Sequence, residues 1–332
     1  QPRTVRKYPV YRHVIFIILT LFSGVVSAQQ VTFNLGWLPQ GSLSGVIIAI
    51  ELGYYTDLGL EVDAVRGYGG NRTVNEIDQG RFALGYGDPI SVALNRARGG
   101  EARLVSSINT RWPAGLCFVL ENHEVEGLDD IAGFTMGGGS GSTVHNLIPV
   151  WLDLNNLPRN HLRMLRMDPA VVDVSLIEGG IDLAECWRGS NRAVIQKYAR
   201  DAGVSVGWLE YADYGVDMYG SGIVSSDPFI QENSDTVERF IQATYRGYAY
   251  AIANPERATE ILLIAYSTLD PVITAQQVTE TADLIIDPAA DNLNLGWFRE
   301  DRMLNTMEFI DQAFNLDGEV QAEDLYTNQF VR

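Results

Sequence analysis

The stretch that decides the fold is residues 36–60, GWLPQGSLSGVIIAIELGYYTDLGL. It begins at the end of an expected strand, and Trp37 lies in the turn that follows. Apolar residues then recur at the i, i+3, i+4, i+7 spacing of a helix with one buried face, at Leu43, Val46, Ile47 and Ile50. Gly53 ends this helix, and Leu60 begins the next strand. Because open α/β sheets form ligand crevices where strands lead into helices, we expect Trp37 to border such a crevice.

The same alternation of strand and helix extends over most of the chain and predicts βα units on mainly parallel sheets. In the first half, strands are expected at 31–37, 60–65, 82–86 and 104–108, and helices at 43–54, 72–79 and 90–98. The pattern restarts after Trp112-Pro113, with strands expected at 116–120, 134–137, 162–167, 181–186 and 204–208. The predicted fold class is therefore α/β with two lobes.

A short internal repeat favours two lobes of like topology. Val74-x-x-Ile77-Asp78-x-Gly80 precedes one expected strand, and Val174-x-x-Ile177-Glu178-x-Gly180 precedes another. Both segments are typical of a helix that ends in a Gly C-cap and leads into an inner strand, and a chance match is the alternative. Since no linker rich in Pro, Gly or Ser is present, we expect two close strands to join the lobes.

The chain from residue 227 onward is expected to be helical. One helix begins after Ser234 and ends at Asn254-Pro255, and three more are expected at 256–266, 275–286 and 301–314. We expect these helices to pack against the first lobe. The predicted boundaries are 1–28 for a leader, 29–111 with 224–332 for lobe 1, and 112–223 for lobe 2.

The first 28 residues have the pattern of a secretory signal peptide. Four basic residues precede the apolar run 14–22, and Val26-Ser27-Ala28 has the small residues of a cleavage site. A single membrane anchor is the alternative. Removing the leader takes the net charge from −18 to −22, because it holds four basic and no acidic residues. The sequence thus predicts a periplasmic protein without stable membrane insertion after cleavage, and its acidity argues against nucleic acid as a partner.

Little in the sequence indicates metal or covalent chemistry. There is no CxxC motif, and the His residues at 13, 123, 145 and 161 are scattered, so no metal site and no cofactor are expected. No Gly-x-Ser-x-Gly motif is present, and Lys197 is the only Lys after the leader, so we expect no enzymatic activity. Cys117 and Cys186 fall in separate expected strands, and both a disulfide and two buried free thiols remain open.

A Gly-rich run at 137–143, GGGSGST, lies between an expected strand and an expected helix. Its amides and hydroxyls suit an anion or a polar ligand atom at the helix N-terminus, and a tight strand-to-helix turn is the alternative. It is not a P-loop, because no Lys precedes Ser or Thr, and it does not fit GxGxxG.

Aromatic and polar residues also recur at other expected strand ends, where crevices open. The segment 211–219 adds phenols and acids that would either line the pocket or lock the hinge. The candidate ligand-binding residues are Trp37, Gln40, Tyr68, Asn71, Tyr86, Asp88, Trp112, Ser140, Ser142, Thr143, Trp187, Tyr214 and Asp217.

Several of these motifs resemble a known family. Trp37-x-Pro39 with Gly45, followed by Gly53-Tyr54-Tyr55-x-x-x-Gly59-Leu60, is similar to the opening of ABC-importer substrate-binding proteins of the thiamine-pyrimidine-precursor (thiamine biosynthesis-like) family. The segments 127–133 and 213–217 are similar as well. The resemblance implies the type II periplasmic binding protein fold, with a two-strand hinge and a small molecule held between the lobes. It also implies a permease and its ATPase as partners, and a monomer.

The resemblance leaves the ligand open. Members that recognise formylaminopyrimidine or hydroxymethylpyrimidine often carry an Asn-His pair where this chain has Ser42 and Leu43. The cofactor Lys of the related pyrimidine synthases has only Ile50 and Leu52 near its place. This chain therefore departs from the family both at the pyrimidine pattern and at the enzyme pattern.

The supply of aromatic residues favours a small flat heteroaromatic, such as a thiamine pyrimidine precursor, stacked between Trp37 and Trp187. An alkanesulfonate, taurine, nitrate or flavin-like ligand is the alternative, and Arg66, Arg111 and Arg188 are available to hold an anion. Alternatives of another class are a secreted enzyme that uses a cleft carboxylate as base, and a ligand sensor.

Overall fold

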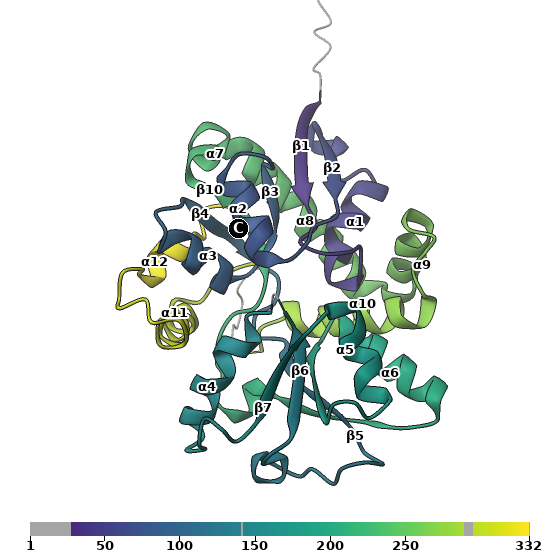
Figure 1. Cartoon of the computed structure of the whole chain (residues 1–332). Coiled ribbons are helices and arrows are strands. Elements are labelled where there is room, and N and C mark those ends of the chain that lie inside the picture. The colour runs from purple at the N-terminus through teal and green to yellow at the C-terminus, as the bar shows by residue number, and fades with distance from the viewer. Residues whose placement is uncertain (1–27, 141, 289–294, 332) are drawn as a thin grey trace, which may run out of the picture.

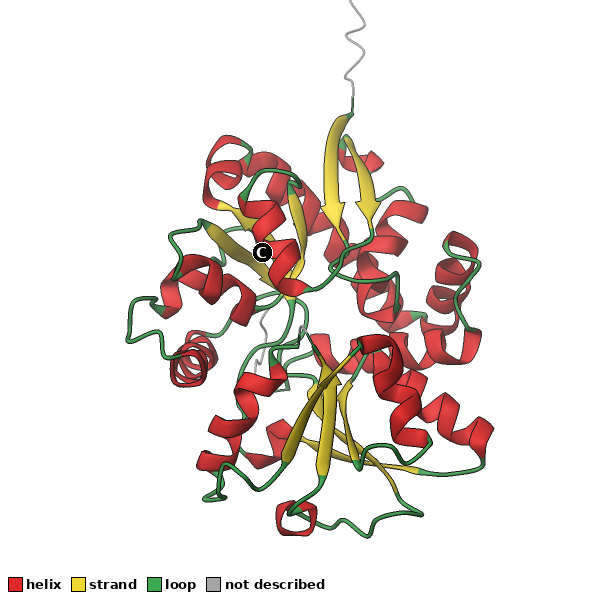
Figure 2. Cartoon of the chain, in the orientation of Figure 1, coloured by secondary structure: helices red, strands yellow, loops and turns green. Residues whose placement is uncertain are grey.

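The computed structural model describes residues 28–140, 142–288 and 295–331. The predicted signal peptide lies outside the described residues, apart from Ala28. Two five-stranded sheets form the framework. Figure 1 and Figure 2 show one sheet in the upper lobe and the other in the lower lobe, with helices around both. The predicted two-lobed α/β fold is confirmed.

Sheet A, in the first lobe, has the strand order β2-β1-β3-β10-β4. Strands β1, β2 and β3 are parallel, and β10 is antiparallel to both of its neighbours. The strands are β1 (Gln29–Asn34), β2 (Leu60–Val65), β3 (Leu84–Gly87), β4 (Ala102–Ser107) and β10 (Gly222–Ser226). The sequence did not predict β10, because Gly and Ser weaken its strand signal although all of its residues are buried.

Sheet B, in the second lobe, repeats this topology with the order β7-β6-β8-β5-β9. Here β6, β7 and β8 are parallel, and β5 is the antiparallel strand. Both sheets are therefore mixed: the prediction of mainly parallel sheets did not include the one strand in each that is antiparallel to both of its neighbours. The strands are β5 (Ala114–Val119), β6 (Thr135–Gly139), β7 (Arg163–Met167), β8 (Leu183–Trp187) and β9 (Val206–Glu210). The internal repeat falls on α2 (Gly70–Asp78) before β3 and on α5 (Pro169–Ile177) before β8, which are equivalent elements. Like topology of the lobes is thus confirmed.

Helices fill the connections and the C-terminal region. Besides α2 and α5 they are α1 (Ser44–Glu51), α3 (Pro89–Arg96), α4 (Val144–Leu154), α6 (Asn191–Ala202), α7 (Asp227–Glu232), α8 (Ser234–Ala253), α9 (Pro255–Ala265), α10 (Pro271–Ile285), α11 (Glu300–Phe314) and α12 (Ala322–Leu325). The helical C-terminal region is confirmed. It contacts lobe 2 as well as lobe 1, because α10 packs on α6 and α11 packs on α4. In the described part of the chain, no helix is long and apolar enough to cross a membrane.

The chain passes between the sheets in two segments that lie side by side. One follows β4 and the other precedes β10. The amides of Ile108 and Asn109 donate to the Ser221 carbonyl at 3.0 and 2.8 Å, and the Gly220 amide donates to the Asn109 carbonyl at 2.9 Å. These bonds form the predicted two-strand hinge.

Within the described ranges, buried hydrophobic residues form three clusters. One lies within lobe 1, and a small one surrounds Cys117 and Cys186 in lobe 2. The third contains residues of both lobes, among them Trp151 and Phe298, and so holds the lobes together on the side of α4 and α11. Cys117 and Cys186 form a disulfide between the adjacent strands β5 and β8, with Cα atoms 5.7 Å apart. This answers the question that the sequence left open.

Candidate functional site

The candidate ligand site lies where the lobes face each other. In sheet A, β2 and β3 follow β1 in the chain and lie on opposite sides of it, so there is a topological switch point between β1 and β3. In sheet B, β7 and β8 lie on opposite sides of β6, so there is a second switch point between β6 and β8. Ligands of open α/β sheets bind outside the carboxyl ends of the strands at such points. The loops after β1 and β8 touch, because the Ser190 hydroxyl donates to Gln40 Oε1 at 2.9 Å. The two switch points therefore lie on facing sides of the lobes.

The lobe 1 wall presents two exposed aromatic rings. Trp37 is 40% exposed in the turn after β1, and Tyr68 is 54% exposed in the loop after β2. The two loops are joined, since the Gly67 amide donates to the Trp37 carbonyl at 3.0 Å. The guanidinium groups of Arg66 and Arg72 lie 4.5 and 4.7 Å from the centre of the Tyr68 ring. Trp37 is thus open to a ligand, whereas Tyr68 already has two cations near its ring.

Two other predicted residues of this wall have partners within lobe 1. The Tyr86 hydroxyl donates to Asn109 Oδ1 at 3.3 Å, and burial raises the pKa of Tyr86. Asp88 caps α3, accepting from the Ser91 amide at 2.9 Å and the Ser91 hydroxyl at 2.7 Å. Burial raises the pKa of Asp88 as well. Asn71 is half-buried in the first turn of α2. Tyr86 and Asp88 therefore shape the wall through bonds inside the lobe.

On the lobe 2 wall, the Gly-rich run surrounds a carboxylate of the protein itself. The Gly139 amide donates to Glu185 Oε1 at 3.0 Å, and the Ser142 hydroxyl bonds to the same carboxyl group. Burial raises the pKa of Glu185, and these hydrogen bonds oppose the rise. Ser140 is exposed, and Thr143, at the N-cap of α4, makes no side-chain cap. The place predicted for an anion or a polar ligand atom thus holds Glu185.

Aromatic rings lie on the same face of sheet B as Glu185. Trp187 is two residues further along β8, opposite Ala114 of β5, and alternate residues of a strand share a face. Its ring centre is 5.2 Å from that of Trp112, which is only 1% exposed. Tyr211, in the turn after β9, is buried close to Glu185, and both burial and the Glu185 charge raise the pKa of Tyr211. The sheet therefore gathers these side chains at its cleft end.

Several buried polar atoms in this region have no hydrogen-bond partner in the part of the chain that the structure describes. They include Trp112 Nε1, Trp151 Nε1, Glu185 Oε2 and the Tyr211 hydroxyl. Since buried polar groups in proteins are nearly always paired, such a group of atoms indicates a place for a ligand or water. The void lined by Trp112, Trp151 and Tyr211 measures about 10 Å³, which is too small for an aromatic ring. A ring reaches this depth only when the surrounding aromatic side chains move apart.

Helix α10 holds the loop after β8 against lobe 1. The Gly189 amide donates to Glu280 Oε2 at 2.7 Å, across the lobe boundary. Arg188 pairs with Asp283 of α10 at 3.1 Å and with Glu210 at 3.5 Å. The positive charge of Arg188 is therefore balanced by two acids.

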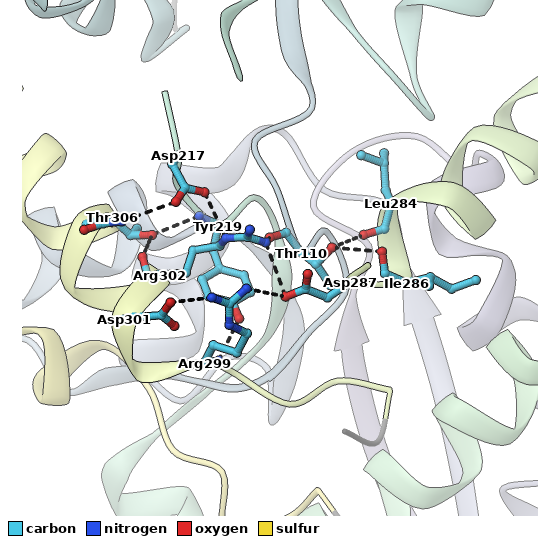
Figure 3. A network of polar contacts seen from close by, with 11 residues as sticks. Thr110, Asp217, Tyr219, Leu284, Ile286, Asp287, Arg299, Asp301, Arg302 and Thr306 are labelled. Atoms are coloured by element: carbon cyan, nitrogen blue, oxygen red, sulfur yellow. Dashed lines mark hydrogen bonds and ion pairs between the residues drawn. The ribbon is translucent and has the colours of Figure 1, made fainter. Parts of the chain in front are cut away.

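Two predicted residues lie away from the facing loops. Tyr214 has its ring 6.3 Å from that of Trp151, and its carbonyl accepts from Asn155 at 2.9 Å, beyond the C-terminal end of α4. The Gly-rich run precedes the other end of this helix, about 15 Å away along its axis. Asp217 is exposed and pairs with Arg302 at 2.9 Å in the hinge network of Figure 3. Of the two roles expected for 211–219, Asp217 takes the hinge role.

A second hollow, of about 420 Å³, lies at the start of β8, at the opposite end of this strand from Trp187. His123 and Asp182 line it and pair at 3.3 Å. This hollow is not part of the candidate site. Within 28–140, 142–288 and 295–331, no three His, Cys, Asp or Glu side chains gather in a way that could hold a metal ion.

Sequence reasoning missed Glu185 and the role of α10. Glu185 lies inside the expected strand 181–186, and a single acid between buried apolar neighbours was the available signal. Helix α10 was expected, but nothing local in its sequence shows that it contacts the second lobe.

Comparisons with known proteins identify relatives of this chain. The chain is 24% identical to the formylaminopyrimidine-binding protein of Halalkalibacterium halodurans, over 90% of each chain. It is 25% identical to the riboflavin-binding protein RibY of Chloroflexus aurantiacus, over 91% of this chain and 86% of that protein. A third relative, 20% identical over 91% of this chain and 92% of its own, is the 4-amino-5-hydroxymethyl-2-methylpyrimidine phosphate synthase of Legionella pneumophila.

The fold matches solved structures over nearly the whole chain. The periplasmic aliphatic sulphonate binding protein SsuA of Escherichia coli superposes with a TM-score of 0.71 at 15% identity, over 91% of this chain and 99% of that one. This likeness shows a shared fold. The sequence profile of the NMT1/THI5-like family matches residues 40–258, which is most of the chain. The chain belongs to the NMT1/THI5-like family.

Proposed function

We propose that the chain is the substrate-binding component of an ABC importer and captures a small flat heteroaromatic, such as a thiamine pyrimidine precursor, between its lobes. In this proposal 29–111 with 222–332 form lobe 1 and 112–221 form lobe 2, so the boundary moves from the expected 224 to the start of β10. The mature protein is a periplasmic monomer, and its ligand-bound form meets a permease with its ATPase. The relatives named after formylaminopyrimidine and riboflavin support a flat ring as ligand.

The observation that carries the proposal is the presence of aromatic rings on both facing walls. Trp37 is exposed in lobe 1, and Trp187 is half-buried at the end of β8 in lobe 2. A ring stacked on an aromatic side chain gains about 0.5–1.5 kcal/mol beyond the burial of its area. Gln40 is already bonded to the loop after β8, so a ligand that enters here also meets polar groups of both lobes.

An alkanesulfonate, taurine or nitrate is the second candidate ligand, supported by the fold shared with a sulphonate-binding protein. A binding site for such an anion would need cationic side chains that are not already paired with acids. Arg188 is balanced by Asp283 and Glu210, and Arg66 lies against Tyr68. Arg188 and Arg66 are therefore less available to an anion, whereas Arg111, in the hinge segment after β4, has no ion pair within the described part of the chain. The anion is thus the second candidate, with Arg111 as its cation.

A thermal-shift screen tests the ligand class. The purified mature protein is heated with 4-amino-5-hydroxymethyl-2-methylpyrimidine, riboflavin, taurine, ethanesulfonate or nitrate. We expect a ring compound to raise the melting temperature by several degrees, because only the folded state binds it. Trp37→Ala should remove this shift, and the control Tyr198→Ala, an exposed residue of α6, should keep it. A shift with ethanesulfonate or taurine but with no ring compound would reject the proposal.

The same samples test the absence of catalysis, which we infer although one relative is named a synthase. The place of the synthase Lys holds Ile50 and Leu52. Mass spectrometry after a long incubation should recover the bound ring compound unchanged. A converted product would assign the chain to an enzyme instead.

A further inference from the structure

The position of Glu185 indicates how the cleft selects its ligand. We propose that Glu185 determines specificity: one carboxylate oxygen accepts from the Gly139 amide of the cradle that an anion would need, and the other receives an N–H donor from the ligand. The ligand class is then an amino-substituted nitrogen heterocycle, neutral or cationic, and sulfonates are rejected. This inference rests on the function proposed above.

The cradle has the shape of this carboxylate. The Gly139 amide donates to Oε1 of Glu185 at 3.0 Å, and the Ser142 hydroxyl bonds to the same group at the start of α4. A Cβ at Gly138 would lie 2.6 Å from His145 Cε1 and 3.1 Å from Glu185 Oε2. Glycine in the run therefore makes room for the two side chains. An incoming anion finds the donors of the cradle already used.

The second oxygen of Glu185 is an acceptor that lacks a donor. Among the described residues, Oε2 is buried without a hydrogen-bond partner, and so is the hydroxyl of Tyr211 nearby. Because buried acceptors are nearly always paired, a ligand N–H is the missing partner. A ring amino group offers that N–H beside a ring nitrogen, which accepts from a hydroxyl.

The groups around Glu185 disfavour a second negative charge. Burial, the hydrogen bonds from Ser142 and Gly139, and the charge of Asp173 on α5 set the pKa of Glu185, with no cation among them. From α4, His145 faces the same run, and burial together with Arg166 lowers its pKa. A sulfonate at this point would lie next to the Glu185 and Asp173 carboxylates, and repulsion between like charges is unfavourable in a buried site. Arg166 also lies at the run, where its exposed guanidinium donates to the Ser140 carbonyl at 3.4 Å.

Isothermal titration of the mature protein tests the inference. The probes are 4-amino-5-hydroxymethyl-2-methylpyrimidine, its 4-methoxy analogue without the amino N–H, and ethanesulfonate. We expect the wild type to bind the amino compound at least tenfold more tightly than the methoxy compound and not to bind ethanesulfonate. Glu185→Gln should weaken the amino compound at least tenfold. The control Glu178→Gln, at the exposed end of α5, should match the wild type.

The outcomes separate this inference from the proposed function. If the wild type binds the amino and methoxy rings equally well, or if Glu185→Gln binds the amino compound like the wild type, Glu185 is not the determinant and the ring-binding function stands. If the wild type binds ethanesulfonate and neither ring, both proposals fail. If the wild type binds none of the probes, the proposed function fails, and the inference fails as well because it rests on that function. The comparison of the two rings uses the wild type alone, so it holds even where the variant does not fold.

Discussion

At the scale of single residues, Asn191 links the carboxyl group of Asp173 to the backbone of β8 behind the cleft. Its side-chain amide donates to Asp173 Oδ1 at 2.9 Å and to the Glu185 carbonyl at 3.1 Å, and its Oδ1 accepts from the Trp187 amide at 2.8 Å. Asp173 is desolvated by burial, which raises its pKa to about 6, while the bond from Asn191 opposes the rise. The site therefore includes an acid that titrates near neutral pH.

Asp173 should make the stability depend on pH. Its pKa is raised in the folded state, so the folded protein holds this proton more tightly than the unfolded chain, and stability is lost as the pH rises from about 4 through about 6. The shift of about 2 pKa units corresponds to at most about 3 kcal/mol. We expect Asp173→Asn to gain stability relative to the wild type across this window, measured by urea unfolding at several pH values. Asp213 is exposed, so Asp213→Asn should differ from the wild type in unfolding free energy by the same amount at each of these pH values. If the difference in unfolding free energy between Asp173→Asn and the wild type were the same at every pH, the raised pKa of Asp173 would be contradicted.

At the scale of elements, helices α1 and α8 cross at a contact of two glycines. A Cβ on Gly247 would lie 2.0 Å from the Gly45 carbonyl oxygen, and a Cβ on Gly45 would lie 2.2 Å from the Tyr248 ring. The Tyr248 hydroxyl donates to the Ser42 carbonyl at 2.8 Å and so ties α8 to the turn before α1. This contact gives a physical reason for Gly45 in the motif after Trp37.

Gly247→Ala should therefore push the two helices apart. Because the obstructing atom belongs to the backbone, a shift of a side chain cannot relieve the clash, and we expect a loss of about 2 kcal/mol or more in unfolding free energy. Gly127→Ala is the control, since its φ is −164° and no atom lies within 4 Å of the added Cβ. Chemical denaturation of the two variants measures the difference. Equal stability of both variants would show that α1 and α8 are packed less closely.

At the scale of the whole molecule, the start of α11 binds both segments of the hinge (Figure 3). Arg302 donates to the Thr110 carbonyl of the first segment at 2.7 Å and pairs with Asp217 of the second at 2.9 Å. The Arg299 amide donates to the Tyr219 hydroxyl at 2.7 Å. With α10 docked on the loop after β8, the C-terminal helices join the lobes at two separate places. Lobe motion must therefore strain or break polar contacts of α10 or α11.

Arg302→Gln should loosen the hinge. Arg302 is mostly buried, so losing its ion pairs should lower the melting temperature by about 2 to 6 °C. It should also increase the radius of gyration of the ligand-free protein in small-angle X-ray scattering. Arg257→Gln is the control, because Arg257 is exposed and its ion pair is with Glu260 of the same helix, α9. An unchanged radius of gyration with a lowered melting temperature would limit Arg302 to a stabilising role.

The sequence by itself determined the βα alternation, the two lobes, the helical C-terminal region and the strand ends at the space between the lobes. These follow from periodicities of 2 and 3.6 residues and from glycine at helix ends, which are local properties. The sequence also contains the internal repeat that falls on α2 and α5, which are equivalent elements of the two lobes. For the same reason it predicted Trp37 and the Gly-rich run at the cleft.

Only the tertiary structure decided how the predicted residues are used. It placed β10 between β3 and β4 in sheet A, joined Cys117 to Cys186, and placed Asp217 at the hinge. It also put Glu185 into the Gly-rich cradle and α10 across the lobe boundary. Each of these depends on partners that are distant in the chain, and no pattern within one segment records which distant segment will supply the other half of a contact.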